Sequence, residues 1–432
     1  MALHQAKQAE TVSNPASTEK WLFPFILVTS LFFFWGFVHN LDPILIPHLR
    51  KAFQLNDLQS SLIDSAVFIA YFIMALPAGY VMRKYGYKAG IVAGLVLFAL
   101  GCFLFLPAAD THQYLFFLGA LFIIASGLTF LETAANPYIT VLGPPESATR
   151  RLNFAQSFNG LAAMMAPVIG GSIILSGKEM NEADYRILSP EALKQYLDIE
   201  SQSVKTPYLV LGILVFLVAV LFLLSKLPDV KGEQDKESGN PLHAFRHRHL
   251  SWAVVAQFFY VGAQVCVASF FIKMARTGAG MDEKTAAQYL GWGFGLAFMS
   301  GRFIGTWLMK YFRSEKLLAI YAVINIILVT VAIFAHGMVV VYALIAIAFF
   351  MSIMFPTIFS LGIKDLGTDT KLASSLIVMS IVGGAVLPPV LGIISDATGS
   401  IQNGYIVPLI CFVVVLLFAI KGYKINTLHK QK

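Results

Sequence analysis

Residues 137–143 read Pro137-x-Ile139-x-x-Leu142-Gly143, and residues 356–362 repeat them as Pro356-x-Ile358-x-x-Leu361-Gly362. A polar loop follows each copy. The same further elements then come in the same order: Arg151-Leu152 or Lys371-Leu372, and Pro167-Val168-Ile169-Gly170 or Pro389-Val390-Leu391-Gly392. Because the copies run in the same direction, the pattern indicates two halves related by a direct repeat.

Both copies lie inside long apolar windows. The chain has 432 residues, of which 57% are hydrophobic and 13% charged, and the mean hydropathy is +0.72. These values exclude a soluble globular protein, and the period-two alternation of an outer-membrane barrel is absent. We therefore predict an all-α membrane protein. Its twelve transmembrane helices lie at 21–44, 60–82, 89–108, 114–142, 153–176, 207–225, 251–274, 286–309, 317–335, 338–362, 373–394 and 405–423.

A polar stretch from Pro228 to His249 separates the sixth window from the seventh. Lys and Arg are concentrated in the tails and in the loops on the same side as this stretch, and that side is cytoplasmic by the positive-inside rule. The net charge of +7 thus needs no nucleic-acid partner. We expect a cytoplasmic tail (1–20), a first six-helix half (21–225), a cytoplasmic linker (226–250), a second half (251–423) and a cytoplasmic tail (424–432).

The sequence indicates neither an enzyme nor a metal protein. Cys102, Cys266 and Cys411 stand singly in apolar segments without metal-ligand spacing. The run Arg246-His247-Arg248-His249 reads as a solvated basic tract rather than a metal site, and no HExxH or GxSxG motif occurs. We therefore expect no cofactor and no catalytic residue.

One acid interrupts the fourth window, in Phe130-Leu131-Glu132-Thr133. A carboxylate near the middle of a bilayer costs about 2.5 kcal/mol or more, so such residues usually serve ions, protons or substrate. A carboxyl group that is neutral when protonated and charged when ionised can couple a proton gradient to a conformational change. The alternative is a structural ion pair with Arg302, the cation well inside the eighth window. Glu132 is our first candidate for proton coupling and for substrate binding.

Polar side chains also recur at helical spacing on three windows. They are Glu132 and Asn136, Gln156 and Asn159, and Gln257, Tyr260 and Gln264, and each set shares one helical face. Amides, a phenol and a carboxylate that face a cavity suit the hydroxyls of a sugar, and Trp35, Phe154 or Tyr260 could cover its apolar face. The alternative is interhelical hydrogen bonding, worth about 0.6 kcal/mol for each bond.

Two parallel six-helix halves, with substrate between them near the midplane, are the arrangement of the major facilitator superfamily. Gly79 to Lys88 resembles the loop motif of that superfamily, with Arg83 in place of its acid. More specifically, the chain resembles the fucose–galactose–glucose:proton symporters from about Leu31 to Ala419. The strings that carry the resemblance are LETAANP at 131–137, RLNFAQ at 151–156, YVGAQ at 260–264 and PTIFSLGIK at 356–364.

This resemblance implies import of a monosaccharide, with L-fucose as first choice, together with a proton across a bacterial inner membrane by a monomer. It implies that Glu132 is the cavity carboxylate and that Asn40, Gln156 and Asn159 contact sugar. A glucose or galactose symporter, sodium coupling and passive facilitation stay open as alternatives. So does a membrane sugar sensor that transports nothing.

Two positions depart from the family pattern. The protonatable acid of the first span aligns with Pro43, whereas this chain has Asp42 one position earlier. One step rotates a side chain by about 100° on a regular helix, so Asp42 serves as the second proton-coupling residue only if Pro43 distorts the turn. Phe355 stands where a cavity tyrosine is expected and keeps a stacking face without the hydroxyl. A lost hydroxyl can change which sugar epimer is preferred.

Overall fold

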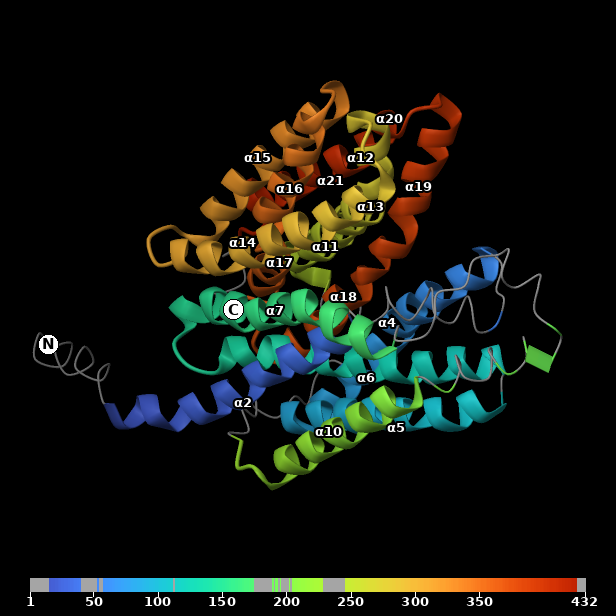
Figure 1. The fold of residues 1–432 in the computed structure, drawn as a ribbon. Helices are drawn as coiled ribbons and strands as arrows, with labels where there is room; N and C mark the ends of the chain where they lie inside the picture. Colours follow the sequence, from blue (N-terminus) through green and yellow to red (C-terminus); the bar gives the residue numbers. More distant parts are fainter. Residues whose placement is uncertain are drawn as a thin grey trace, which may run out of the picture.

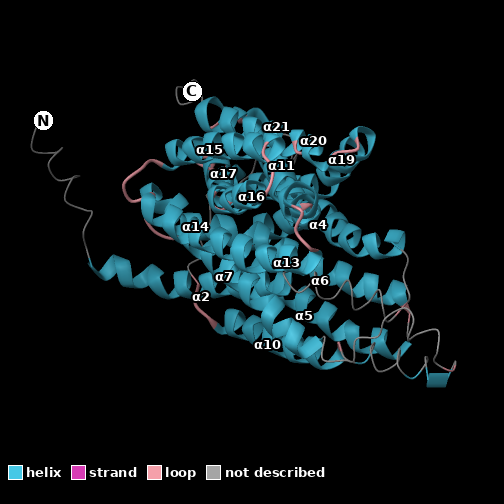
Figure 2. Ribbon diagram, turned by 45° about the horizontal axis from the view of Figure 1, so that its top comes forward, coloured by secondary structure: helices cyan, strands magenta, loops and turns pink. Residues whose placement is uncertain are grey.

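The structure is a computed structural model that describes residues 15–39, 53, 57–111, 113–174, 189, 191–192, 195, 202, 204–227 and 245–425. Throughout this part of the chain the secondary structure is helical, without strands (Figure 2). Helices satisfy their own backbone hydrogen bonds, which a hydrocarbon environment requires. The predicted all-α membrane fold is therefore confirmed.

Six long helices form the first bundle, coloured blue to green in Figure 1. They are α2 (Pro15–His39), α4 (Asp57–Tyr85), α5 (Tyr87–Thr111), α6 (Tyr114–Val141), α7 (Ala148–Ile174) and α10 (Lys205–Leu224). Between α4 and α5 the chain turns at Gly86, whose φ of 89° favours glycine. Lys88 then donates to the carbonyls of Leu223 and Ser225 at 2.8 and 2.9 Å, so its charge neutralises the carboxyl end of α10.

The second bundle, yellow to red in Figure 1, is more interrupted. Its helices are α11 (Arg248–Ser269), α12 (Phe271–Ala279), α13 (Glu283–Gln288), the π-helix η4 (Tyr289–Phe294), α14 (Gly295–Leu308), α15 (Ser314–Phe334), α16 (Met338–Met351), α17 (Met354–Gly362), α18 (Thr370–Met379), α19 (Gly383–Thr398), α20 (Ile401–Gly404), α21 (Ile406–Leu417) and the π-helix η7 (Phe418–Gly422). Short 3-10 turns, η2 (Pro145–Ser147), η5 (Gly367–Asp369) and η6 (Ser380–Val382), precede α7, α18 and α19.

By length and composition, nine helical segments of the described part can cross a membrane. They overlap nine of the twelve predicted windows, and α2, α7 and α14 overlap the other three. The described helices are thus consistent with the predicted count of twelve.

The two bundles meet along α4, α6 and α7 of the first and α14, α17 and α18 of the second (Figure 1). The halves approach each other closely at Gly79 of α4, where an added Cβ would lie 2.0 Å from Oγ of Ser375 on α18. From this junction α19 runs away from the first bundle (Figure 1). The halves are therefore closed against each other at one end of the molecule, the end that carries the α6–α7 connection; we call it the closed end.

Candidate functional site

The candidate site forms where prolines leave backbone carbonyls free. Proline has no N–H to donate to the carbonyl four residues earlier. Pro137 thus frees the Thr133 carbonyl, which accepts a hydrogen bond of 2.6 Å from Oγ of Ser374 in the other half. Pro356 likewise frees the Ser352 carbonyl, which accepts from Nε of Arg302 at 3.0 Å. The repeated motif therefore creates the same acceptor in both halves.

Glu132 lies on α6 at this level, with 5% of its surface exposed. The Tyr71 hydroxyl on α4 is a hydrogen-bond partner of its carboxyl group, and the charge of Arg302 on α14 acts on it from the other half. The described structure places no ion pair between Glu132 and Arg302. The guanidinium instead donates to neutral acceptors, so the structural alternative considered for Glu132 does not hold in this conformation.

A chain of amides joins α6, α7 and α14. Nε2 of Gln156 donates to Oδ1 of Asn136 at 3.0 Å. Nη1 of Arg302 donates to the backbone carbonyl of Gln156 at 2.5 Å and to its Oε1 at 3.3 Å. All three side chains are buried, and Asn136 is, like Tyr71, a hydrogen-bond partner of the Glu132 carboxyl group. The structure thus brings Glu132, Asn136 and Gln156 together in one buried polar network.

The residues on α11 have different environments. Tyr260 is fully buried, and its hydroxyl donates to the Met351 carbonyl at 3.0 Å, where α16 ends. Its ring lies 6.4 Å from that of Phe355, edge to face. Gln257 is also buried, and neither amide atom has a partner, whereas Gln264 is half-buried. Gln257 is therefore the residue of this set with free hydrogen-bonding capacity.

The remaining candidates lie on or near α2. Trp35 is 3% exposed and packs against Phe32 with ring centres 5.2 Å apart. Asn159 approaches α2 at Gly36, where its Cγ would lie 2.8 Å from an added Cβ. Asn40 and Asp42 lie outside the described residues.

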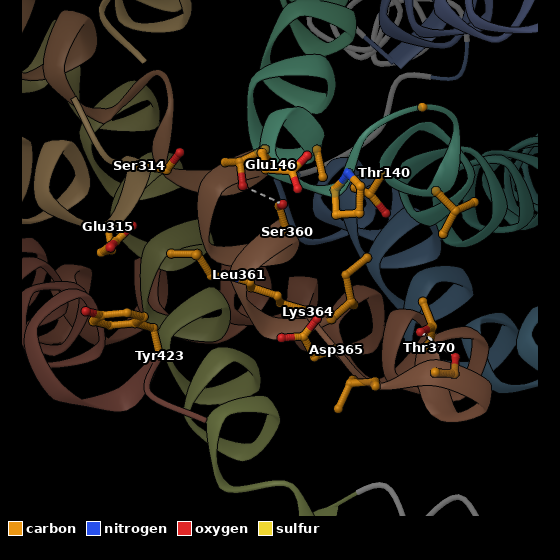
Figure 3. Close-up of a pocket in the computed structure, with 18 of the residues that line it drawn as sticks. Thr140, Glu146, Ser314, Glu315, Ser360, Leu361, Lys364, Asp365, Thr370 and Tyr423 are labelled. Carbon is orange, nitrogen blue, oxygen red and sulfur yellow. Dashed lines mark hydrogen bonds between the residues drawn. The ribbon is translucent and has the colours of Figure 1, made fainter. Parts of the chain in front are cut away.

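A cavity of about 740 Å³ opens at the closed end (Figure 3). It lies between the α6–α7 connection, the start of α15 and the loop after α17. Its lining carries both signs of charge, with Glu146, Glu315 and Asp365 against Arg313, Lys364 and Lys371. The predicted site residues do not line it, so this cavity is separate from the candidate site.

Arg151, which precedes the predicted fifth span, organises the α6–α7 connection. Its guanidinium donates to the carbonyls of Ile139, Thr140 and Pro144 at 3.3, 2.8 and 2.6 Å, and also to the Ser147 hydroxyl. Burial lowers the pKa of Arg151 to about 10, which leaves the side chain charged at neutral pH. A cation at the carboxyl end of α6 also stabilises the helix dipole.

The sequence interpretation missed the polar contacts that close this end. Oγ1 of Thr149 lies 2.8 Å from Oγ of Ser360 (dashed line to Ser360 in Figure 3). Nδ2 of Asn153 donates to Oγ1 of Thr357 at 3.2 Å. A usable signal existed, because Thr149, Asn153 and Gln156 share one face of α7 at helical spacing.

A membrane fold of two helical bundles with buried polar groups between them defines a class of transport proteins. The family profile described as Major Facilitator Superfamily matches residues 25–370. The chain belongs to the major facilitator superfamily, and it is a multi-pass membrane protein rather than an enzyme.

The chain is similar to two transporters and to one solved structure of this superfamily. The chain is 46% identical over 414 residues to the L-fucose-proton symporter of Escherichia coli K12, covering 94% of each protein. It is 41% identical over 423 residues to the glucose/galactose transporter of Brucella abortus, covering 95% of this chain and 98% of that one. A crystal structure of FucP in the outward conformation matches with a TM-score of 0.87 at 46% identity, covering 93% of this chain and 98% of that chain.

Proposed function

We propose that this protein imports a monosaccharide, with L-fucose as first candidate, together with a proton by alternating access. The observation that carries the proposal is the burial of Glu132 between two helical bundles, with a buried amide network beside it. A group at this depth can exchange a proton with either side as the bundles rock. The names of the relatives at 46% and 35% identity, both L-fucose-proton symporters, support the same cargo.

We propose that sugar hydroxyls are bound by the amides of Asn136, Gln156, Asn159 and Gln257. Gln264 and Asn40 are the further polar candidates, and Tyr260, Phe355 and Trp35 supply aromatic surface. Unpartnered buried amides support this assignment, because a buried polar atom without a hydrogen bond costs about 1–3 kcal/mol until a ligand satisfies it. Asp42 is proposed as the second proton-coupling residue on its sequence position.

We infer that the closed end faces the cytoplasm, with both termini and the linker at 226–250 on that side of a bacterial inner membrane. The distribution of Lys and Arg supports this orientation. The structure then corresponds to the state that awaits sugar from outside, and it matches the crystal structure of FucP in the outward conformation. We propose that a monomer of two halves, 21–225 and 251–423, is the working unit.

Glucose or galactose is the second candidate cargo, which the Brucella abortus relative at 41% identity favours. The test is uptake of radiolabelled L-fucose, D-galactose and D-glucose into sodium-free proteoliposomes with an imposed inward proton gradient. We expect L-fucose to accumulate above its external concentration. Accumulation of glucose or galactose alone would overturn the choice of sugar, equilibration without accumulation would indicate a facilitator, and no uptake of any of the three would favour a sensor.

A further inference from the structure

One face of α7 is hydrogen-bonded to the second half at three successive turns. From the closed end inward, Thr149 pairs with Ser360, Asn153 with Thr357, and Gln156 with Arg302. We call these three pairs the α7 ladder. Positions i, i+4 and i+7 lie on one helical face, so the ladder closes as a unit when α7 meets α17 and α14. The contacts must separate when the closed end opens.

Arg302 differs from the other members of the ladder because it carries a charge. Arg302 is 5% exposed, and its guanidinium lies 4.7 Å from the centre of the Phe298 ring. It donates across the halves to Gln156 and within its own half to Ser352. These partners are neutral, so none of them balances the positive charge. Attraction between charges is strong in such a water-poor environment.

Glu132 is the acid that acts on this charge. It lies in the first half, one helical turn before Asn136, which accepts from Gln156, and Gln156 accepts from Arg302. The electrostatic interaction between Glu132 and Arg302 crosses the same boundary as the ladder. The other titratable groups described around the pair are the Tyr71 hydroxyl on α4 and the Tyr260 hydroxyl on α11. When Glu132 is ionised, its attraction for Arg302 favours the closed ladder. When Glu132 binds a proton, that attraction disappears and opening becomes easier.

We propose that Arg302 is a positioning residue that transmits the protonation state of Glu132 to the α7 ladder and thereby to the closed end. This inference rests on the proposed function, since it assigns the ladder to proton-coupled transport. It also explains why Arg302 lies inside a span without an ion-pair partner among the described residues: the charge stabilises one conformational state instead of a fixed structure.

The test is chemical labelling of a cysteine behind the ladder. Ser374 is fully buried between the halves, and Ser374→Cys is a small change. The natural residues Cys102, Cys266 and Cys411 are all buried and give a low background. Inside-out vesicles are treated with a membrane-impermeant maleimide at acidic and alkaline pH. Each rate is divided by that of Ser314→Cys, a cavity-lining control at the closed end, which corrects for thiol reactivity.

We expect faster normalised labelling at acidic pH, by at least about fivefold, the low end of coupling between protein sites. Adding Glu132→Gln should give the fast rate at both pH values. Arg302→Gln should also remove the pH dependence, whereas Arg302→Lys, which keeps the charge, should retain it. If Arg302 had a purely structural role, the Arg302→Gln and Arg302→Lys variants would show the same pH dependence of labelling.

Three results would overturn the proposal: no pH dependence in the parent, pH dependence that survives Arg302→Gln, or equal behaviour of the Gln and Lys variants. The Lys variant keeps the test decisive if Arg302→Gln does not fold. The labelling needs no sugar. Failure of the sugar-uptake experiment with the expected labelling would therefore reject the proposed cargo and leave this inference standing.

Discussion

Pro137 and Pro356 each leave a carbonyl without its helical donor, and side chains from other helices fill both vacancies. Ser374 reaches the Thr133 carbonyl, and Arg302 reaches that of Ser352. In a bilayer a free carbonyl has no water to bind, so these contacts fix where helices meet. The repeated proline thus creates hydrogen bonds between helices. The sequence alone shows the repeat but not these contacts.

Gln156 is the residue whose loss should affect most contacts at the site. Gln156→Ala removes the donor to Asn136 and one acceptor of Arg302. Leaving buried polar atoms unsatisfied costs about 1–3 kcal/mol. We expect a lower unfolding temperature in detergent and weaker L-fucose binding by calorimetry. Asn159→Ala, outside the Asn136–Gln156–Arg302 network, is the matched variant and should weaken binding with less effect on stability. Unchanged affinity in both variants would contradict their assignment to sugar.

Residue patterns indicate part of the buried polar network. Glu132 and Asn136 share a face of one helix, and that could be read from spacing alone. The partner of Arg302 could not, because a sequence does not state which face of α14 meets α7. For the same reason the contacts of the Thr149, Thr357 and Ser360 hydroxyls could not be predicted. Single hydroxyls on apolar helices commonly bond to their own backbone, as Thr357 also does to the Ile353 carbonyl.

At the scale of helices, the junction of α4 and α18 depends on the missing side chain of Gly79. An added Cβ would lie 2.0 Å from Oγ of Ser375 and 3.1 Å from its Cβ. Overpacking of this kind costs about 1–3 kcal/mol. Because the contact lies between the halves, the cost falls on the closed end rather than on either bundle.

We therefore expect Gly79→Ala to slow sugar uptake by about fivefold or more, since 1 kcal/mol is a factor of about five. Ser375→Gly, which removes the opposing atoms, should restore the rate in the double variant. Gly119→Ala is the control, because nothing lies within 4 Å of an added Cβ there. Initial rates in proteoliposomes provide the measurement. A double variant as slow as Gly79→Ala would mean that this contact does not limit transport.

The helices themselves were largely predictable, since long apolar windows leave few alternatives in a membrane. Their interruptions were not. The break between α16 and α17 and the π-helix before α14 depend on contacts with neighbouring helices. Local composition does not determine such contacts.

At the scale of the whole molecule, two bundles closed at one end hold the buried acid Glu132 between them. This arrangement allows an ordered sequence of events. Sugar and proton bind from the side opposite the closed end, and the α7 ladder then separates. Coupling requires that the acid change charge within each cycle. A molecule whose Glu132 had a purely structural role would lack the proton coupling that we assign to this residue.

Sugar-driven proton influx tests this claim most directly. In sodium-free, lightly buffered cells that express the protein, adding L-fucose should make the medium more alkaline as protons enter with the sugar. Glu132→Gln, a neutral side chain of nearly the same shape, should abolish this alkalinisation and gradient-driven accumulation while retaining sugar exchange. Proton influx of normal size in Glu132→Gln, or sugar accumulation that needs sodium and moves no protons, would contradict the account.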